Sequence, residues 1–324
     1  MKKRQVYAML YKKTPLRALA LAFSLLAACL LSSCGSPSAS EDPAKTADES
    51  AAGGSAAAES PAASSQADAQ KTAFSPLNIR FLKVGKADAM ILTSGNETLV
   101  LDAGEEDDGA ELLSVLSELS VSRVDYLIIT HFDKDHVGGA DTLLENFEVG
   151  TVYLPDYEGE GTDYNEFIYA MEKAGISPIR LTASVSFPFG DAQVSIDPPA
   201  SYEVPEGETE YDNNFSLITT IVHGENRMVF MGDAEKAEIR DWLLGASAEK
   251  CALLKFPHHG SYNKALSELL KTLSPAYAVI CDSDKNPADD KALELLAACG
   301  VQVFETKDGD VLASSDGKTI SIVQ

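Results

Sequence analysis

Short apolar runs, bounded by Gly, Asn, Asp or Pro, recur from residue 74 to the end of the chain. Runs of about four to eight such residues are typical of β-strands. Strands are predicted at residues 79–84, 89–94, 98–104, 124–130, 151–155, 216–224, 227–233, 252–256, 276–282 and 301–306, with a terminal strand pair after them. The dipeptide Gly95-Asn96 separates the second and third runs and predicts a hairpin turn.

Between several of these runs, apolar residues recur at the spacing of a helix. Leu112, Val115, Leu116 and Leu119 recur at the spacing of a helix face. Further helices are predicted at residues 166–174, 235–244 and 264–273, and before the strand at 301. Hairpins come early and strand–helix alternation comes later, which predicts an α/β domain with two sheets and helices outside them.

The first 34 residues have the layout of a secretory signal peptide. They contain six basic residues and no acidic residue, and an apolar run occupies residues 18–31. This run is shorter than the roughly 20 residues of a membrane-spanning helix. It ends in LSSC, which resembles the bacterial lipobox and so implies cleavage before Cys34 and lipidation of its thiol. An uncleaved N-terminal anchor is the alternative, and either one places the folded part outside the cytoplasmic membrane.

Residues 35–73 contain only Gly, Ala, Ser, Thr, Pro, Gln, Lys, Asp and Glu. Without large apolar side chains this segment cannot offset its conformational entropy, so we expect a disordered linker. The predicted organisation is therefore a signal peptide at 1–34, a linker at 35–73 and a folded domain at 74–324.

Acidic residues dominate the chain, whose net charge is −24. Six of the 26 basic residues lie in the first 34 positions, so the remainder carries 20 basic and 50 acidic residues and a charge of −30. Such a surface repels phosphate backbones and attracts cations. The five cysteines contain no CxxC pair, which excludes a thiolate zinc knuckle.

Four of the five histidines lie in two short motifs. The first, THFDKDHVGG at residues 130–139, directly follows an apolar strand. Alternation along the chain is expected to send His131, Asp133 and Asp135 to one side, and the turn into the glycines to bring His136 to them. Two imidazoles and two carboxylates form a set of metal ligands. The alternative is an acidic turn with incidental histidines.

This motif resembles the HxHxDH signature of the metallo-β-lactamase superfamily, with Asp133 at the position of the second His. The HxDxDH variant is similar to the extracytoplasmic hydrolase domain of ComEC-type DNA-uptake proteins and to phosphorylcholine esterases of cell-wall teichoic acid. The segments FLKVGKADAMIL, LVLDAG, NNFSLI, MGDAE and FPHHGS also resemble, in order, ComEC-type motifs across residues 78–324. The resemblance implies a metallo-β-lactamase αββα sandwich, in which two mixed β-sheets carry helices on their outer faces.

The resemblance also implies six metal ligands. Metal 1 takes His131 and Asp133, metal 2 takes Asp135, His136 and His258, and Asp233 bridges the two ions. Zinc is the favoured ion at both positions. Because metal 1 is rich in oxygen ligands, manganese or iron competes there. A hydroxide shared between the ions would attack the substrate.

Other residues receive supporting roles from the same resemblance. Asp102 is expected to orient a metal ligand. The family has a further His before the bridging Asp, which this chain lacks, and Asn214 is left there as a weak contact to the metal. Asp135 and His259 are the predicted catalytic residues, with His259 beside the ligands or facing the substrate. His223, before a hairpin glycine, is expected to be exposed and without a role.

The late loop, residues 284–290, lacks the His that the family pattern has there and carries Asp289 and Asp290. This change puts nuclease activity in doubt. The predicted function is a hydrolase of a phosphate ester or phosphodiester at the cell envelope, attached to the membrane through its lipid. The alternatives are a DNA-processing nuclease related to competence, and a non-catalytic metal-binding lipoprotein. The partners expected are a small anionic substrate and the membrane, with nucleic acid disfavoured.

The lipobox generates a direct prediction. Replacing Cys34 by Ala removes the thiol that would carry the lipid, so the protein should be released to the medium or remain as an uncut precursor. Membrane fractionation and the mass of the N-terminal peptide measure this outcome. Unchanged mass and unchanged membrane retention would show that Cys34 is not lipidated.

Overall fold

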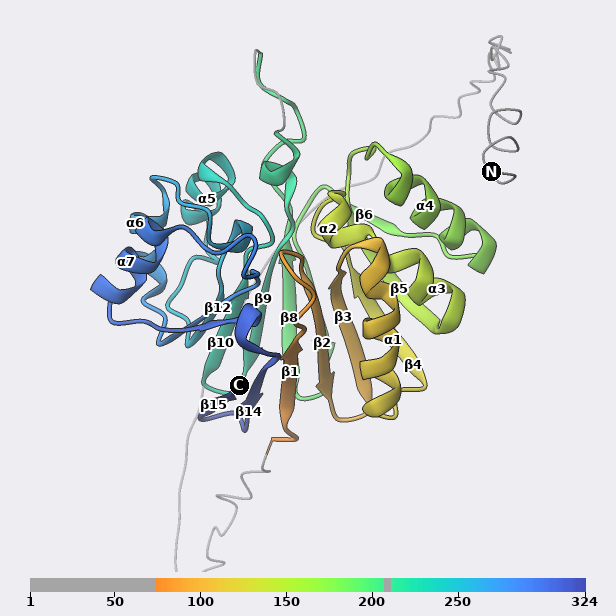
Figure 1. Ribbon diagram of the computed structural model, residues 1–324, viewed down its shortest axis with the longest axis horizontal. Coiled ribbons are helices and arrows are strands. Elements are labelled where there is room, and N and C mark those ends of the chain that lie inside the picture. The colour runs from red at the N-terminus through yellow and green to blue at the C-terminus, as the bar shows by residue number, and fades with distance from the viewer. Residues whose placement is uncertain (1–73, 207–210) are drawn as a thin grey trace, which may run out of the picture. The chain divides into compact units, whose positions relative to one another are not determined.

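The computed structural model describes residues 74–206 and 211–324 as two β-sheets packed face to face with helices on both outer sides (Figure 1). The predicted signal peptide, Cys34 and the predicted linker lie outside the described residues. The first sheet has the order β15 (Ile320–Val323), β14 (Val311–Ser315), β1 (Leu77–Phe81), β2 (Ala89–Ser94), β3 (Glu97–Ala103), β4 (Arg123–Ile128), β5 (Glu148–Pro155) and β6 (Ile179–Leu181). The second has the order β13 (Gln302–Glu305), β12 (Tyr277–Ile280), β11 (Leu253–Lys255), β10 (Asn226–Phe230), β9 (Ile218–His223), β8 (Ala192–Asp197) and β7 (Val185–Phe189).

The helices divide between the two sheets (Figure 1). On the side of the first sheet lie α1 (Gly109–Glu118), α2 (Lys134–Val137), α3 (Ala140–Asn146) and α4 (Thr162–Ala174). On the side of the second lie α5 (Lys236–Leu243), α6 (Leu266–Leu273) and α7 (Asp290–Ala298). Short 3-10 turns are η2 (Glu106–Asp108), η3 (Asp212–Phe215), η4 (His258–Gly260) and η5 (Thr306–Asp308). Among the described residues, no helix combines the length and apolar character needed to cross a bilayer.

Strand alternation builds three apolar layers. In β3, Leu99 and Leu101 face the second sheet and pack with residues such as Phe230, whereas Val100 faces the helices of the first sheet. The helix face predicted from the leucine spacing packs there through Leu112. Because both faces of each sheet are covered, strands of both sheets are apolar at successive positions rather than at every second one.

The predicted α/β sandwich with two mixed sheets is confirmed. The turn at Gly95 joins β2 to β3 with Ser94 opposite Glu97, and Gly95 has the positive φ of 61° that such turns require. The hairpin of β7 and β8 was not predicted. Pro188 interrupts its first strand, and β7 can accommodate this proline because it lies at the sheet edge with β8 as its neighbour.

Helix α5 carries a buried carboxyl group. Glu238 is 4% exposed and lies one turn before Trp242 on the helix. Burial, followed by the charges of Asp241 and Asp197, raises the pKa of Glu238 from 4.5 to about 8. The folded protein therefore keeps a proton on Glu238 at neutral pH.

Glu238→Gln should stabilise the fold increasingly as the pH rises. The unfolded chain loses this proton near pH 4.5 and the folded chain near pH 8. The contribution of protonated Glu238 to wild-type stability is therefore fully present below pH 4.5 and is lost as the pH rises through about 8. This pKa difference corresponds to at most about 5 kcal/mol. Urea unfolding between about pH 5 and pH 9 measures the effect.

The matched control is Glu268→Gln, which changes an exposed glutamate on α6. Its stability relative to the wild type should stay constant over the same range. A constant difference for Glu238→Gln as well would contradict the prediction.

Candidate metal centre

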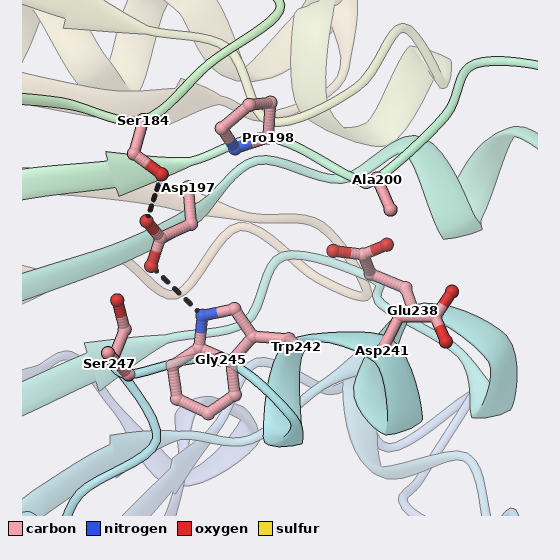
Figure 2. A pocket seen from close by; sticks show the side chains of 10 residues that line it. Ser184, Asp197, Pro198, Ala200, Glu238, Asp241, Trp242, Gly245 and Ser247 are labelled. Atoms are coloured by element: carbon pink, nitrogen blue, oxygen red, sulfur yellow. Dashed lines mark hydrogen bonds between the residues drawn. The ribbon is translucent and has the colours of Figure 1, made fainter.

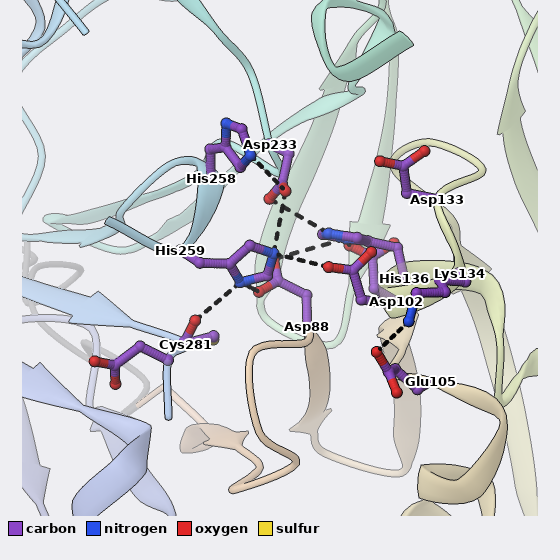
Figure 3. Close-up of polar contacts among 12 residues, drawn as sticks. Asp88, Asp102, Glu105, Asp133, Lys134, His136, Asp233, His258, His259 and Cys281 are labelled. Atoms are coloured by element: carbon purple, nitrogen blue, oxygen red, sulfur yellow. Dashed lines mark hydrogen bonds and ion pairs between the residues drawn. The ribbon is translucent and has the colours of Figure 1, made fainter. Parts of the chain in front are cut away.

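The candidate site lies where strand ends from both sheets meet (Figure 3). Strands β3 and β4 are parallel neighbours, as are β10 and β11. Their carboxyl ends therefore point to the same edge of each sheet, which is where open α/β sheets place ligands. The chain leaving β4 carries His131, the chain leaving β10 carries Asp233, and the chain leaving β11 carries His259.

Asp102 organises the histidines of the first motif. It is fully buried at the end of β3, and its Oδ1 accepts a hydrogen bond from the Thr130 backbone N–H at 2.7 Å. Its Oδ2 accepts from the Thr130 hydroxyl at 2.8 Å and lies 2.9 Å from Nδ1 of His136. The Thr130 oxygen in turn lies 3.1 Å from Nδ1 of His131. Asp102 thus fixes both rings through their Nδ1 atoms.

The second motif separates its two histidines. His258, His259 and Gly260 all have positive φ, at 46°, 51° and 84°. His259 is buried, with its Nδ1 bonded to the Cys281 carbonyl at 2.9 Å and its Nε2 3.1 Å from Asp233 Oδ2. His258 instead directs Nδ1 to Glu235 Oε1 at 3.2 Å, with Nε2 3.9 Å from Asp233. The geometry therefore favours His259 over His258 as the ligand, the reverse of the predicted assignment.

Asp135 reaches the site from a helix. The sequence pattern predicted an extended loop in which alternation would align its side chain with His131, but residues Lys134–Val137 form α2. The helical turn places Asp135 Oδ2 3.5 Å from Nε2 of His259. Burial opposes ionisation, yet the neighbouring imidazoles of His259 and His136 lower the pKa of Asp135. Asp135 joins the site in the ionised form that a cation needs.

Several buried atoms in this cluster lack a hydrogen-bond partner among the described residues. They are Nε2 of His131, Nε2 of His136, Nε2 of His259 and Oδ1 of Asp233. Leaving such atoms unpaired in the interior costs about 1–3 kcal/mol each. Two overlapping groups, His131, His136 and Asp233 and then Asp135, His136 and His259, bring their ligand atoms within 4.8 Å of one another. The donors therefore fit bound divalent cations.

Lys255 and Asp88 form a buried ion pair beneath the ligands, and neither was singled out from the sequence. Both are fully buried and in direct contact, and Lys255 Nζ also donates to the Gly232 carbonyl at 3.1 Å. Lys255 lies 3.8 Å from Asp233 Oδ1. Burial alone would lower the pKa of Lys255, but the charge of Asp88 raises it, so the lysine remains charged. Burial opposes the ionisation of Asp233, but the charges of His259 and then His136 lower its pKa.

Asp133 has an acidic neighbour that the motifs did not identify. Its Oδ2 lies 3.6 Å from Nε2 of His131. Asp212, from η3, interacts with Asp133, and burial together with that charge raises the pKa of Asp212. Asn214, predicted as a weak contact near the metals, accepts a hydrogen bond through Oδ1 from the Glu238 N–H at 3.1 Å and so supports the start of α5. Asp212 stands immediately before the NN motif, which is the feature that could have identified it.

The expectation that His223 is exposed is wrong. Its side chain is buried, its Nδ1 lies 2.8 Å from the Ser315 hydroxyl, and the Phe74 ring packs edge-on against it. The hairpin that carries it is covered by the C-terminal strands, because the Glu225 N–H donates to the Gly317 carbonyl. His223 therefore has a packing role.

The family described as the Metallo-beta-lactamase superfamily matches residues 82–281, more than half of the chain and all six predicted ligands. The chain belongs to the metallo-β-lactamase superfamily. The fold of this superfamily binds divalent metal ions, which agrees with the unpaired histidine and aspartate atoms.

Two curated relatives support the ComEC-like branch of the metallo-β-lactamase superfamily. ComE operon protein 3 of Bacillus subtilis is 27% identical over 199 residues, covering 60% of this chain and 25% of the relative. Recombination protein 2 of Haemophilus influenzae is 25% identical over 210 residues, covering 64% of this chain and 24% of the relative. The chain thus spans about a quarter of each relative's length. Among solved structures, the metallo-beta-lactamase fold protein YhfI from Bacillus subtilis matches with a TM-score of 0.49 and 12% identity, covering 76% of this chain and 100% of that one.

The two histidines of the turn give opposite predictions for metal content. His259→Ala removes a buried donor and should lower the metal bound by about one ion per chain, whereas His258→Ala should retain the wild-type amount. Elemental analysis after dialysis measures the content, and circular dichroism checks that both variants fold. If His258→Ala lost metal and His259→Ala retained it, His258 would be the ligand, as the motif predicted.

Proposed function

We propose that this chain is a two-metal hydrolase that cleaves small phosphate esters or phosphodiesters outside the cell membrane, where a lipid on Cys34 holds it. The observation that carries the proposal is the set of buried imidazole and carboxylate atoms without partners at the meeting point of the two sheets. The described part of the protein offers these atoms charge contacts but no hydrogen bonds, whereas divalent ions would coordinate them directly.

His131, Asp133 and Asp233 would hold one ion, and Asp135, His136 and His259 the other, with Asp233 shared. Zinc suits the imidazole-rich group, and the oxygen-rich group also suits manganese or iron. Bound ions would neutralise charge on a phosphate oxygen and promote the attack of water. The chain's own contribution is orientation: Asp102, Thr130 and the Cys281 carbonyl fix the rings through Nδ1, so that each Nε2 faces the centre.

His258 is suited to deliver a proton to the leaving oxygen. Its side chain is 20% exposed, and Glu235 lies 3.2 Å from its Nδ1. The hydrogen bond with His258 is the main cause that lowers the pKa of Glu235, so the carboxylate stays ionised and can accept a hydrogen bond from Nδ1 of the imidazole, which orients the ring. We therefore assign to His258 the role that the missing late-loop His would have, and to His259 the role of ligand.

Charge favours a small substrate over nucleic acid. The chain beyond residue 34 carries a balance of −30, which a long polyanion must approach along its whole length. Asp289 lies at the turn itself, since its Oδ2 accepts from the Tyr262 N–H at 2.7 Å and its N–H donates to the Gly260 carbonyl. The second candidate is a DNA-processing nuclease. It is favoured by the 25% identity to a relative whose name, Recombination protein 2, refers to DNA.

A substrate panel separates these functions. Metal-loaded protein should hydrolyse bis-p-nitrophenyl phosphate or p-nitrophenyl phosphorylcholine and leave labelled single- and double-stranded DNA intact at low salt. Asp135→Ala should lower turnover by at least about 100-fold, because it removes a charged group from the reacting centre. DNA cleavage without turnover of small esters would establish the nuclease, and metal binding without any turnover would establish a binding protein.

The proton-donor role is tested by changing the leaving group. His258→Gln should slow esters with an alkoxide leaving group by about 10²–10⁴-fold, but should affect p-nitrophenyl esters little, because p-nitrophenolate departs without a proton. Equal loss on both classes would show that His258 acts elsewhere. Unchanged metal content in His258→Gln is the control.

A further inference from the structure

A cavity lies apart from the metal centre, between the end of β8 and helix α5, with a volume of about 320 Å³ (Figure 2). Its mouth includes the exposed residues Ala200, Asp241 and Gly245. Its floor is formed by Asp197, Glu238 and Trp242, all of which are buried. The cavity therefore opens to solvent above a floor that is both acidic and aromatic.

No basic side chain lines this cavity, although three carboxyl groups do. Asp197 already has two donors, because its Oδ1 accepts from the Ser184 hydroxyl at 2.6 Å and its Oδ2 accepts from the Trp242 Nε1–H at 3.1 Å. Glu238 differs. Only 4% of this residue is exposed, and no described residue donates a hydrogen bond to its carboxyl group.

The carboxyl of Glu238 points into the cavity, toward the space between Pro198 and Trp242 (Figure 2). Because no described residue donates to this carboxyl, its hydrogen-bond partner must come from the cavity itself. The missing partner must carry N–H or O–H donors and tolerate two further acidic neighbours, Asp197 and Asp241. A cation with hydrogen-bond donors meets both requirements.

The arrangement does not suit a metal ion. Among the described residues, the groups whose ligand atoms lie within 4.8 Å of one another do not include Asp197, Glu238 or Asp241. The indole of Trp242 instead offers an apolar wall, and aromatic faces attract organic cations. The cavity is also larger than an ion requires.

We propose that this cavity binds the primary ammonium group of a small aliphatic amine, with the ammonium hydrogen-bonded to Glu238 and the alkyl chain against Trp242. A primary ammonium supplies three donors, whereas a quaternary ammonium supplies none. The unpaired carboxyl therefore selects the primary amine.

The ionisation of Glu238 agrees with this occupant. In the absence of a cation, burial and then the charges of Asp241 and Asp197 raise its pKa to about 8; Tyr202 is the other titratable group that faces it. An ammonium at the carboxyl favours the charged form, so binding at neutral pH releases the Glu238 proton. Calorimetry in buffers of different ionisation enthalpy detects that proton.

The chain contains a single tryptophan, Trp242, so intrinsic tryptophan fluorescence reports on this cavity alone. In full-length protein, putrescine should produce a saturable change in that fluorescence. Glu238→Gln should weaken binding by about tenfold or more, because it removes a charge-assisted hydrogen bond. Glu268→Gln, which removes an exposed glutamate from α6, should bind putrescine as the wild type does and controls for general attraction to the acidic surface.

Choline is the comparison ligand. Weaker binding of choline than of putrescine, together with the loss in Glu238→Gln and a released proton, supports the proposal. Binding of putrescine that Glu238→Gln leaves unchanged, or the absence of any fluorescence change, would overturn it. Choline binding as tightly as putrescine would overturn the assignment to primary amines. Thermal melting of Glu238→Gln shows that the variant is folded.

Discussion

Buried negative charge is the constraint on which the rest of this structure depends. Asp88, Asp102 and Asp233 are all almost wholly buried around one point, and Lys255 contacts the first of them and approaches the third. Leaving a buried charge without its partner typically costs about 3–5 kcal/mol. One lysine cannot balance three carboxylates together with Asp135. His259 and His136 lower the pKa of Asp233 against its burial, and cations bound at the strand ends would balance the remaining negative charge.

The sandwich makes that meeting possible because its apolar layers fix both sheets independently of the site. The layer between the sheets places the end of β4 next to the start of β9, which pairs with the end of β10, as the hydrogen bond from the Leu217 N–H to the Thr130 carbonyl shows. Ligands from distant parts of the sequence thus converge without any of them contributing to the core. His136 contacts residues from both sheets. Asp102, at the end of β3, orients its ring through Nδ1, and its Nε2 lies near Asp233, which follows β10.

The sequence predicted the layers and most of the ligand cluster, because apolar runs and strand-end motifs are local features. The motif led to His258 as the ligand instead of His259, because the choice between them depends on three successive positive φ angles that the pattern does not show. Lys255 was overlooked because it sits inside an apolar run that reads as an ordinary strand. Glu238 was overlooked for a related reason: an acid in an amphipathic helix normally faces water, and here η3 and the chain after β8 lie against α5 and bury it.

The late loop, residues 284–290, packs closely against the turn that carries His258 and His259, and this contact limits which positions can change. A side chain at Gly260 would come within 2.4 Å of the Ala288 Cβ, so bulk cannot be added at Gly260 without displacing the loop. Asp289 follows Ala288, and its N–H donates a hydrogen bond to the Gly260 carbonyl of the same turn. Descendants of this sequence are thus free to vary the tip of the loop, residues 284–287, while its base remains tied to the turn.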